Sequence, residues 1–570
     1  MTLRSLLRPP FLPIPAGRAS VVDDQMRAGR RGRPLRVAVG LLVLAVVLLV
    51  VGGCASVPAP GDPAGLTTAS GANLEGLPPG QMVKGDYEAA RASEPFAAKL
   101  ADLVDENRLA INIVWLLVTG FLVMFMQAGF ALVETGFTRA KNALHTMSMN
   151  FMIYAIGIVG FYLLGFGLAF GGLGLVGVSN LGGLKPLDGM LTVDLGGHTW
   201  GLVGTTGFAL TGAAYDVGVV AFFLFQLVFM DTAATIPTGA MAERWRWKPF
   251  VIYGLFVSAI LYPVYAAWAW GGGWLSQLGQ IGLGSGYVDF AGSGVVHAVG
   301  GWCALAGAMV LGPRIGKFNP DGTPNPIPGH NSILAILGTF ILAFGWFGFN
   351  PGSTFGASGN GALRIGIIAV ATMLASGFGA VSAMLYTWWT EGKPNPGMMA
   401  NGMLAGLVAI TAPSGYVGAA AGAIIGAVAG VLVCLSAALV ERILKVDDPV
   451  GAIAVHGFNG LWGQLAVGLF ADGTANYGGF QVTGLLYGNP GQLVAQLIGA
   501  AAAFVWAFGA SYLFFRLLDR VVKLRVSPEA ELAGLDVPEL GLAGYVPDLL
   551  PAGPAPGVEG RRGTPLPEPA

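Results

Sequence analysis

Two stretches of the chain place a histidine eight residues after an aspartate, with only small and apolar residues between them. They are Asp289-Phe-Ala-Gly-Ser-Gly-Val-Val-His297 and Asp448-Pro-Val-Gly-Ala-Ile-Ala-Val-His456. In a helix, which rises about 1.5 Å per residue, each histidine would lie roughly 12 Å along the axis from its aspartate. An aspartate at either face of a hydrocarbon core about 30 Å thick would bring its histidine near the midplane. Imidazoles at that depth are costly unless they are paired and functional.

The chemistry open to such a pair follows from its burial. A charged imidazolium is costly to desolvate, so both rings are expected to be neutral. Neutral rings can share one N–H···N hydrogen bond and still leave each ring a nitrogen for what passes. An intramembrane enzyme is a competing hypothesis, but no serine or cysteine nucleophile accompanies the pair and no His-Glu-x-x-His spacing occurs. We therefore expect no enzyme activity, no metal and no other cofactor.

The two aspartates have a structural and electrostatic role to fill. Asp289 and Asp448 stand where a helix N-cap would accept hydrogen bonds from the first free amides. Pro449 follows Asp448 directly, and proline is favoured at the first helical position. We expect both aspartates to cap the segments that carry the histidines, without touching a substrate.

The composition indicates the kind of chain that positions these residues. Of 570 residues, 54% are hydrophobic and 11% are charged, and the mean hydropathy is +0.67. These values exclude an ordinary water-soluble protein and predict an all-α polytopic membrane protein. The net charge is -1 and no basic patch is interleaved with aromatics, so we expect no nucleic-acid partner. The 90 glycines suit helices that approach closely in lipid. Glycine recurs every four residues at Gly418, Gly422, Gly426 and Gly430, which would place these four residues on one face of a helix.

The N-terminal part resembles an export signal followed by an arm. Arginines between Arg27 and Arg36 precede an apolar run, 37–53, that ends at Cys54. We interpret 1–54 as a signal peptide region. Cys54 stands where a lipoprotein signal places its lipidated cysteine, and an ordinary cleavage slightly further on is the alternative. Residues 55–108 are polar and rich in proline and glycine, which predicts a weakly structured exported arm.

Beyond the arm, eleven apolar segments are long enough to be transmembrane helices. The basic residues gather in alternate loops, whereas the loops 177–214 and 471–492 contain only Lys185 between them. This alternation predicts a plasma-membrane protein with its N-terminus outside and its C-terminal tail, 519–570, in the cytoplasm. The predicted segments are 111–133, 148–176, 215–239, 250–270, 291–312, 331–350, 362–389, 397–412, 416–440, 450–470 and 493–516.

The two Asp-to-His stretches open the fifth and the tenth segment. Because five segments separate them, they must run in opposite directions across the membrane. This predicts an inverted repeat of five plus five helices, 109–312 and 313–470, with a loop and an eleventh helix in 471–518. Such folds place their site at the midplane between the repeats, where His297 and His456 can meet.

Four residues near the ends of these segments could bind a small cation. Phe229, Trp270, Phe349 and Ser353, here called the aromatic cup, would offer cation–π attraction and one hydroxyl. Phe225 lies one helical turn from Phe229. Aromatic residues at the ends of spans also form the interfacial belt, so belt and cup both stay open on the pattern alone.

Six motifs resemble those of the ammonium transporter (Amt/Mep/Rh) family, and they occur in the family's order across about residues 110–545. They are Gln127-Ala-Gly-Phe with Glu134-Thr-Gly-Phe-Thr-Arg-Ala-Lys-Asn142, Asp231-Thr-Ala-Ala-Thr-Ile-Pro-Thr-Gly-Ala-Met-Ala-Glu-Arg244, Trp270-Gly-Gly-Gly-Trp-Leu, Gly345-Trp-Phe-Gly-Phe-Asn-Pro-Gly-Ser353 and the two Asp-to-His stretches.

The resemblance implies how ammonium enters. Phe229, Trp270 and Ser353 match the family's outer ammonium recruitment site, with Phe225 nearby, and Phe229 and Phe349 match its stacked phenylalanine gate. The family's proteins are homotrimers of eleven-helix protomers in the lipid bilayer, and each protomer has its own narrow pore. Methylammonium is expected to act as an analogue of the substrate.

The resemblance also implies how the pore works. His297 and His456 match the twin histidines, and Asp289 matches the family's aspartate beneath the recruitment site. The implied function is recruitment of NH4+ and conduction of NH3, with or without a separately relayed proton. An ammonium sensor acting through a tail-bound partner and a Rhesus-type gas channel are alternatives, and the intact Trp270 and Ser353 disfavour the gas channel.

Two departures from the family's pattern limit what the resemblance implies. Asp231 puts an acid where small residues are expected, so the packing of the third segment does not follow from the family. The tail from Arg525 to Tyr545 is close to the family's regulatory tail but less acidic and without its usual histidine. A cytoplasmic regulator of the PII type at the tail is therefore expected less firmly than transport.

Overall fold

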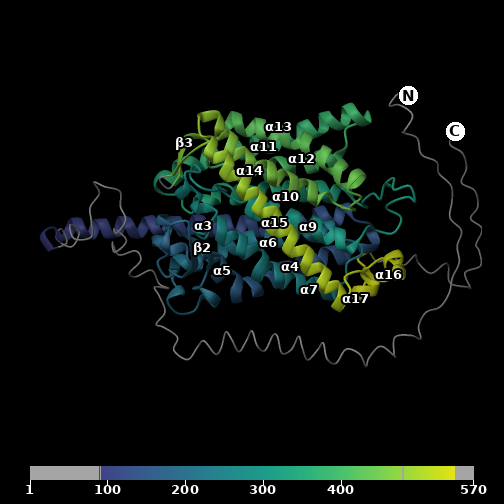
Figure 1. The fold of residues 1–570 in the computed structure, drawn as a ribbon, viewed down its shortest axis with the longest axis horizontal. Helices are drawn as coiled ribbons and strands as arrows, with labels where there is room; N and C mark the ends of the chain where they lie inside the picture. Colours follow the sequence, from purple (N-terminus) through teal and green to yellow (C-terminus); the bar gives the residue numbers. More distant parts are fainter. Residues whose placement is uncertain (1–88, 90–91, 478–479, 546–570) are drawn as a thin grey trace, which may run out of the picture. The chain divides into compact units, whose positions relative to one another are not determined.

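The computed structural model describes residue 89 and residues 92–477 and 480–545. The predicted signal region with Cys54, most of the arm and residues 546–570 of the tail lie outside the described residues. Within them the chain forms a bundle of helices (Figure 1). A cluster of buried apolar side chains runs through the long helices, and polar side chains are buried among them.

Each of the eleven predicted segments lies on a helix. Nine helical stretches of the described chain are long and apolar enough to cross a membrane. The helix α12 is shorter, and the stretch 453–470 is not among the nine. The count of eleven spans therefore remains a prediction. The helices are α3 (Pro95–Phe137), α4 (Ala143–Gly160), η5 (Phe161–Gly165), α5 (Phe166–Phe170), α6 (Val217–Ala240), α7 (Trp247–Phe256), η10 (Val257–Leu261), α8 (Tyr262–Ala269), η12 (Ser293–Ala298), α9 (Val299–Leu311), α10 (Ser332–Phe349), η13 (Pro351–Thr354), α11 (Gly359–Glu391), α12 (Pro396–Thr411), α13 (Ala419–Ala438), η14 (Leu439–Ile443), η15 (Ile453–Phe458), α14 (Asn459–Phe470) and α15 (Pro490–Val522).

Polar residues at the helix starts satisfy amides that a helix cannot pair internally. Asp216 accepts from the amide of Gly218 before α6, and Asn331 accepts from the amides of Ile333 and Leu334 at the start of α10. Asparagines also cap α12 and α15, in each case with proline in the first turn. The starts of these helices are thus fixed by local sequence, as expected for N-caps.

Two of the predicted loops contain short antiparallel hairpins, so the all-α prediction holds for the long segments but not for every connection. In the first, β1 (Met190–Leu195) pairs with β2 (His198–Gly204) across the turn Gly196-Gly197. Both glycines have positive φ, 64° and 79°, as a two-residue turn of this kind requires. The second pairs β3 (Asp472–Tyr477) with β4 (Phe480–Thr483).

The end of the predicted arm is not weakly structured. Helix α3 begins at Pro95, in a stretch that was expected to be irregular, and continues without a break into the first apolar segment. Proline at the first helical position and the helix-forming residues that follow it, up to Asn107, account for this start. In Figure 1 this end of α3 projects beyond the other helices of the bundle.

Small residues let helix backbones approach closely at two contacts. A Cβ on Gly129 of α3 would lie 2.9 Å from the carbonyl oxygen of Gly338 in α10, and one on Gly338 would lie 2.6 Å from the carbonyl oxygen of Gly129. Three members of the predicted glycine face, Gly422, Gly426 and Gly430, press in the same way on α11. The fourth residue of that face stands before α13 and makes only ordinary contact. Close backbone packing therefore explains much of the glycine content.

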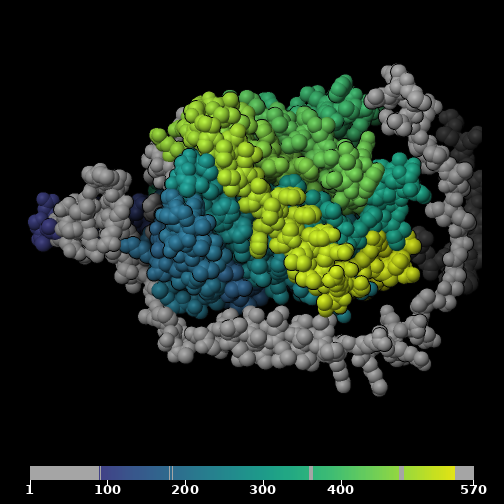
Figure 2. Space-filling model, viewed as in Figure 1, coloured from purple at the N-terminus to yellow at the C-terminus, as the bar shows by residue number. Residues whose placement is uncertain are grey.

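Helix α15 lies across one face of the bundle. It packs against α9 and α14, and it leads to the short tail helices α16 (Pro528–Ala533) and α17 (Asp536–Leu540) (Figure 1). In Figure 2 the same helix forms a continuous band on this face of the molecule, from the green helices to the yellow tail. The tail helices lie at the end of the bundle where the loops carry the basic residues (Figure 1).

Candidate functional site

The structure brings the two histidines of the repeated stretches together. His297 lies in η12 and His456 in η15, and their Nδ1 atoms are 3.2 Å apart. The ring centroids are 5.2 Å apart with the planes tilted by 31°. Both side chains are buried, at 0% and 5% exposure. One Nδ1 must donate and the other accept, so the pair shares one hydrogen bond, and the Nε2 atoms stay outside it.

Matched local structures position the two histidines. Both η12 and η15 are π-helical turns that continue directly into an α-helix. Such turns are rare and occur frequently at functional sites. Each is preceded by the same Asp-x-x-Gly turn, in which Gly292 has φ 113° and Gly451 has φ 82°. Residues with a Cβ rarely adopt these backbone angles, which explains glycine at the same place in both stretches.

The aspartates cap these turns with their carboxylates. Asp289 accepts from the amides of Gly292, Gly294 and Val295 at 2.8 to 2.9 Å. Its counterpart Asp448 accepts from two amides, those of Gly451 at 3.0 Å and Ile453 at 2.7 Å. Both carboxylates are thus used in local hydrogen bonding, and η12 begins four residues after its aspartate rather than directly after it.

The surroundings of Asp289 connect it to the aromatic cup. The indole Nε1 of Trp270 donates to the backbone oxygen of Asp289 at 2.6 Å. On the other side Tyr287 lies 3.3 Å from the carboxylate and donates to Gln464 at 3.0 Å. The aspartate therefore orients Trp270 through its backbone while its side chain is held by the capping amides.

The aromatic rings form a continuous file that ends at the histidines. The ring of Phe229 lies 6.2 Å from that of the half-buried Trp270, 4.6 Å from that of Phe225 and 4.1 Å from that of Phe349. Phe349 in turn stacks on His297, with centroids 5.4 Å apart. The aromatic residues expected in the cup and in the phenylalanine gate thus lie in one row.

Ser353 lies beside this file. It belongs to η13, and its hydroxyl donates to the backbone oxygen of Phe349 at 2.8 Å. The lone pairs of this oxygen are the part of the hydroxyl suited to accept a hydrogen bond from a cationic N–H group. Its position one turn from Phe349 is compatible with the predicted recruitment role.

Sequence reasoning missed two aromatic neighbours of the histidines. Trp346 stacks on His297 at 5.3 Å and is held by a hydrogen bond from its Nε1 to Thr411 Oγ1 at 2.9 Å. The ring of Phe130 lies 6.0 Å from that of His456. Trp346 belongs to the same Gly-Trp-Phe-Gly-Phe motif as Phe349, so its motif was the available signal. Phe130 likewise ends the Gln127-Ala-Gly-Phe motif, but nothing in that motif indicated a contact with His456, because the two residues lie on helices distant in sequence.

A small cavity lies next to His456. Its volume is about 20 Å³, which is room for about one water molecule. His456, Glu134 and Asn401 are its polar lining residues, and the rest of the lining is apolar. The sequence placed Glu134 in a motif without giving it a role. The unexpected acid Asp231 is buried elsewhere on α6, and within the described part of the chain its Oδ1 has no hydrogen-bond partner.

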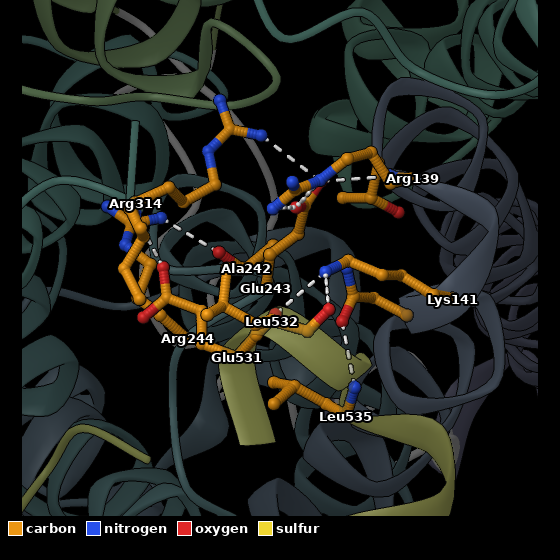
Figure 3. Close-up of polar contacts among 12 residues, drawn as sticks. Arg139, Lys141, Ala242, Glu243, Arg244, Arg314, Glu531, Leu532 and Leu535 are labelled. Carbon is orange, nitrogen blue, oxygen red and sulfur yellow. Dashed lines mark hydrogen bonds and ion pairs between the residues drawn. The ribbon is translucent and has the colours of Figure 1, made fainter. Parts of the chain in front are cut away.

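A buried charged cluster anchors the loop before η15. Glu243 binds Arg139 at 2.5 Å and Arg314 at 3.1 Å (Figure 3). Arg314 also makes a two-pronged contact with Asp447 at 2.8 and 2.9 Å. Arg244 donates to the backbone oxygen of Asp447 at 2.8 Å. Asp447 directly precedes the capping Asp448, so this cluster fixes the start of the stretch that carries the second histidine.

The electrostatics of Asp447 follow from its two cationic neighbours. Burial alone would raise the pKa of its carboxyl group, but the charge of Arg244 and the hydrogen bonds and charge of Arg314 hold the pKa well below its usual range. The same contacts raise the pKa of Arg314 despite its burial. The pair is therefore ionised at neutral pH, within a buried cluster where Arg314 also pairs with Glu243 and Asp447 also faces the charge of Arg244.

The described tail docks on the same loops. Lys141 Nζ donates to the backbone oxygens of Glu531 and Leu532 at 2.8 and 2.7 Å (Figure 3). The carboxylate of Glu531 accepts from the amide of Ile315 at 2.7 Å. Asp536 accepts from the amides of two residues at the start of α4, the nearer at 2.8 Å. The tail thus contacts the loops that surround the charged cluster.

Comparison with known proteins agrees with the motifs. A model of the Ammonium Transporter Family matches residues 114–545. The chain is 47% identical over 454 residues to ammonium transporter Amt2 of Archaeoglobus fulgidus, covering 78% of this chain and 90% of that protein. It is 39% identical over 473 residues to ammonium transporter Amt1 of Haloferax mediterranei, covering 81% and 84%.

Solved structures show the same fold. A protein described as "Sensor Amt Protein" matches with a TM-score of 0.66 and 38% identity, over 76% of this chain and all of that chain. The crystal structure of Candida albicans Mep2 matches with a TM-score of 0.62 and 29% identity, over 74% of this chain and 87% of that one.

Proposed function

The chain belongs to the ammonium transporter family of multi-pass membrane proteins, and from that premise we propose that it recruits NH4+ at the aromatic cup and conducts NH3 past the paired histidines. The observation that carries the proposal is the unbroken row of rings from Trp270 through Phe229 and Phe349 to His297 and His456. A row of this kind offers a cation first an aromatic face and then an apolar passage that ends at proton-accepting nitrogens.

Each part of the row has a physical role in the proposed mechanism. Trp270, the half-buried end of the row, attracts the cation, and Ser353 accepts a hydrogen bond as hydration water leaves. The stacked pair Phe229 and Phe349 excludes a hydrated ion. Ammonium can leave a proton behind and cross as NH3, whereas potassium has no proton to leave. The neutral histidines offer nitrogens as stepping stones for NH3 or as a relay for the proton.

The same premise supports the architecture that the sequence predicts. The matched Asp-x-x-Gly turns and π-helical turns of η12 and η15 support an inverted repeat, 109–312 and 313–470, around the histidine pair. Eleven spans, a homotrimer, a plasma-membrane location with the N-terminus outside, and cleavage of the region 1–54 belong to this proposal.

Current and flux measurements on purified protein test the proposed function. Proteoliposomes are adsorbed on a supported membrane and exposed to ammonium, methylammonium and potassium, with protein-free liposomes as the control. Stopped-flow uptake with an internal pH dye measures ammonia flux in the same preparation. We expect flux with ammonium and methylammonium and no potassium current. Absence of any ammonium-dependent signal would refute the proposal, and flux that survives loss of the cup would favour a Rhesus-type gas channel.

An ammonium sensor is the second candidate, because a solved protein described as a sensor matches 76% of this chain, and the match covers the whole of that protein's chain. In this chain the tail helices α16 and α17 dock on loops beside the charged cluster, so a tail-bound partner of the PII type could read the state of the bundle. Hydrogen exchange of the tail amides with and without ammonium separates the candidates. A sensor predicts ammonium-dependent exchange in α16 and α17 without flux, whereas a transporter predicts flux.

A further inference from the structure

Glu134 is a buried carboxyl group on a third helix, and it lines the same small cavity as His456. It lies on α3 one turn after Phe130, the residue whose ring contacts His456. Its side chain is 2% exposed, and it lines the same cavity of about 20 Å³ as His456. One water molecule in this cavity would have His456, Glu134 and Asn401 as its polar neighbours, which is enough to hold it.

No cation compensates this carboxyl group. Within the described residues no lysine or arginine forms an ion pair with Glu134, and the charged group that acts on it through space is another acid, Asp448. Its direct partners are neutral: the Asn150 amide, the Thr238 hydroxyl and the backbone of Gly239. A buried carboxylate without a cation is costly, so the stability of Glu134 at this place depends on its hydrogen bonds and on its protonation state.

The donors around Glu134 can be assigned in sequence. Gln127 Nε2 donates to Thr235 Oγ1 at 3.0 Å, and Thr235 Oγ1 donates to Asn150 Oδ1 at 3.0 Å. This contact fixes the orientation of the Asn150 amide, whose Nδ2 then donates to Glu134 Oε2 at 2.6 Å. Oε2 is therefore an acceptor, and any proton on Glu134 is on Oε1.

The Thr238 hydroxyl can satisfy a protonated Glu134. Its Oγ1 lies 2.5 Å from the backbone oxygen of Thr235 and 3.0 and 2.8 Å from Glu134 Oε1 and Oε2. The single hydroxyl hydrogen can be donated to the Thr235 oxygen, which can only accept. In that arrangement a proton on Glu134 Oε1 can be donated to Thr238 Oγ1, so the site accommodates the protonated acid.

The same residues can also hold the ionised form. If Glu134 loses its proton, rotation of the Thr238 hydroxyl turns its hydrogen from the Thr235 oxygen to the carboxylate, where Oε1 and Oε2 are 3.0 and 2.8 Å away. Asn150 continues to donate to Oε2. The site thus satisfies both protonation states with one hydroxyl rotation, as a proton carrier requires.

We propose that Glu134 receives the proton that the His297–His456 pair takes from ammonium and passes it on beyond the cavity. This inference rests on the proposed conduction of ammonium past the pair. The proton moves in four balanced steps. Glu134 releases its own proton to water beyond the cavity and becomes a carboxylate. NH4+ gives a proton to the pair and continues as NH3. The protonated pair returns to neutrality as the proton crosses the cavity water to Glu134. NH3 takes up the released proton, so one NH4+ crosses in each cycle.

Replacement by glutamine separates proton transfer from folding. In Glu134→Gln the side-chain amide can donate to Thr238 and its oxygen can accept from Asn150, as in the protonated acid. The amide cannot take up or release a proton, however. General acid–base groups contribute about 10²–10⁴-fold to rates, so we expect the ammonium-evoked current to fall roughly 100-fold. Stopped-flow ammonia flux should remain. Asp231→Asn, which neutralises another buried acid outside this cavity, is the matched control and should keep its current.

Two further measurements keep the inference testable if Glu134→Gln fails to fold. Infrared spectra of the wild-type protein should show the carbonyl band of a buried protonated acid, shifted in D2O and altered by ammonium. Thr238→Val, which removes the rotating hydroxyl, should lower the current and shift this band, while Thr238→Ser should restore both.

The outcomes distinguish this inference from the proposed function. Loss of current with flux retained in Glu134→Gln, and wild-type behaviour of Asp231→Asn, support the proton path. Full current in a folded Glu134→Gln, or no current but normal ammonia flux in the wild type, would overturn it while leaving ammonia conduction intact. Absence of both signals in the wild type would overturn the proposed function and this inference with it.

Discussion

The substitution Gly301→Ala tests whether the distance between the histidines matters, because it alters no side chain of the pore. Gly301 lies one turn after His297 on α9, at the point where α9 meets η15. A Cβ there would lie 2.1 Å from the backbone nitrogen of Gly457, 2.5 Å from its Cα and 2.7 Å from the backbone carbonyl carbon of His456. Carbon atoms normally approach to about 3.5–4.0 Å, so the two segments would have to separate by roughly 1 Å.

That separation acts directly on the histidine pair. The Nδ1–Nδ1 distance is 3.2 Å, and an increase of roughly 1 Å takes it beyond hydrogen-bonding range. We expect Gly301→Ala to destabilise the protein by about 1–3 kcal/mol, as overpacking does. At a temperature where the variant is folded, the ammonium current should still fall, and by more than the loss of stability explains.

The assay for Gly301→Ala is current in proteoliposomes, together with thermal unfolding in detergent. Gly509→Ala is the matched control, because a Cβ at Gly509 on α15 meets nothing within 4 Å. An alanine at an exposed helical glycine should leave transport unchanged and stabilise by about 0.5–1 kcal/mol. Unchanged current and unchanged unfolding temperature in Gly301→Ala would show that this close approach does not set the geometry of the pair.

Three further predictions concern Trp270 of the aromatic cup, the capping Asp289, and Asp447 of the charged cluster. Trp270→Leu should weaken ammonium recruitment by about 0.5–2 kcal/mol, or roughly 2- to 30-fold in the half-saturating concentration, and an unchanged value would assign the residue to an interfacial belt. Asp289→Asn should lower transport and also destabilise by about 1–3 kcal/mol, because both carboxylate oxygens accept amide hydrogens and the new amide group cannot. Asp447→Asn should cost about 3–5 kcal/mol in detergent unfolding, because it removes the two-pronged contact of the buried Arg314 and leaves it one carboxylate contact, with Glu243 at 3.1 Å. The depressed pKa of Asp447 means that its contribution is fully present above about pH 3.9 and is lost as pH falls below that value, so the difference between variant and wild type should be constant near neutral pH and shrink in acid.

The helical segments could be predicted from the sequence because lipid leaves the chain little choice. Backbone groups in hydrocarbon must be paired internally, so each long apolar run becomes a helix. The two hairpins and the helical start at Pro95 were missed because they lie outside the long apolar segments, where composition constrains structure less.

The histidine stretches could be predicted because their information is local and repeated. The same spacing of aspartate, glycine and histidine produces the same capped turn twice, at Asp289 and at Asp448. Their π-helical form could not be read from the residues. Trp346 and Glu134 were given no role because the contact of Trp346 with His297, and the cavity that Glu134 shares with His456, join helices far apart in sequence.

Replacing the histidines singly by an acid tests the central claim most directly, because in the proposed mechanism His297 and His456 take the proton that ammonium has and potassium lacks. His297→Asp and His456→Asp are compared with the wild-type protein in currents evoked by ammonium and by potassium, with the double alanine variant as a further comparison. The account predicts that either acid lets ammonium pass as an ion and lets potassium follow, and that the double alanine variant loses most ammonium current. Wild-type ammonium currents and undiminished potassium exclusion in all three variants would contradict it.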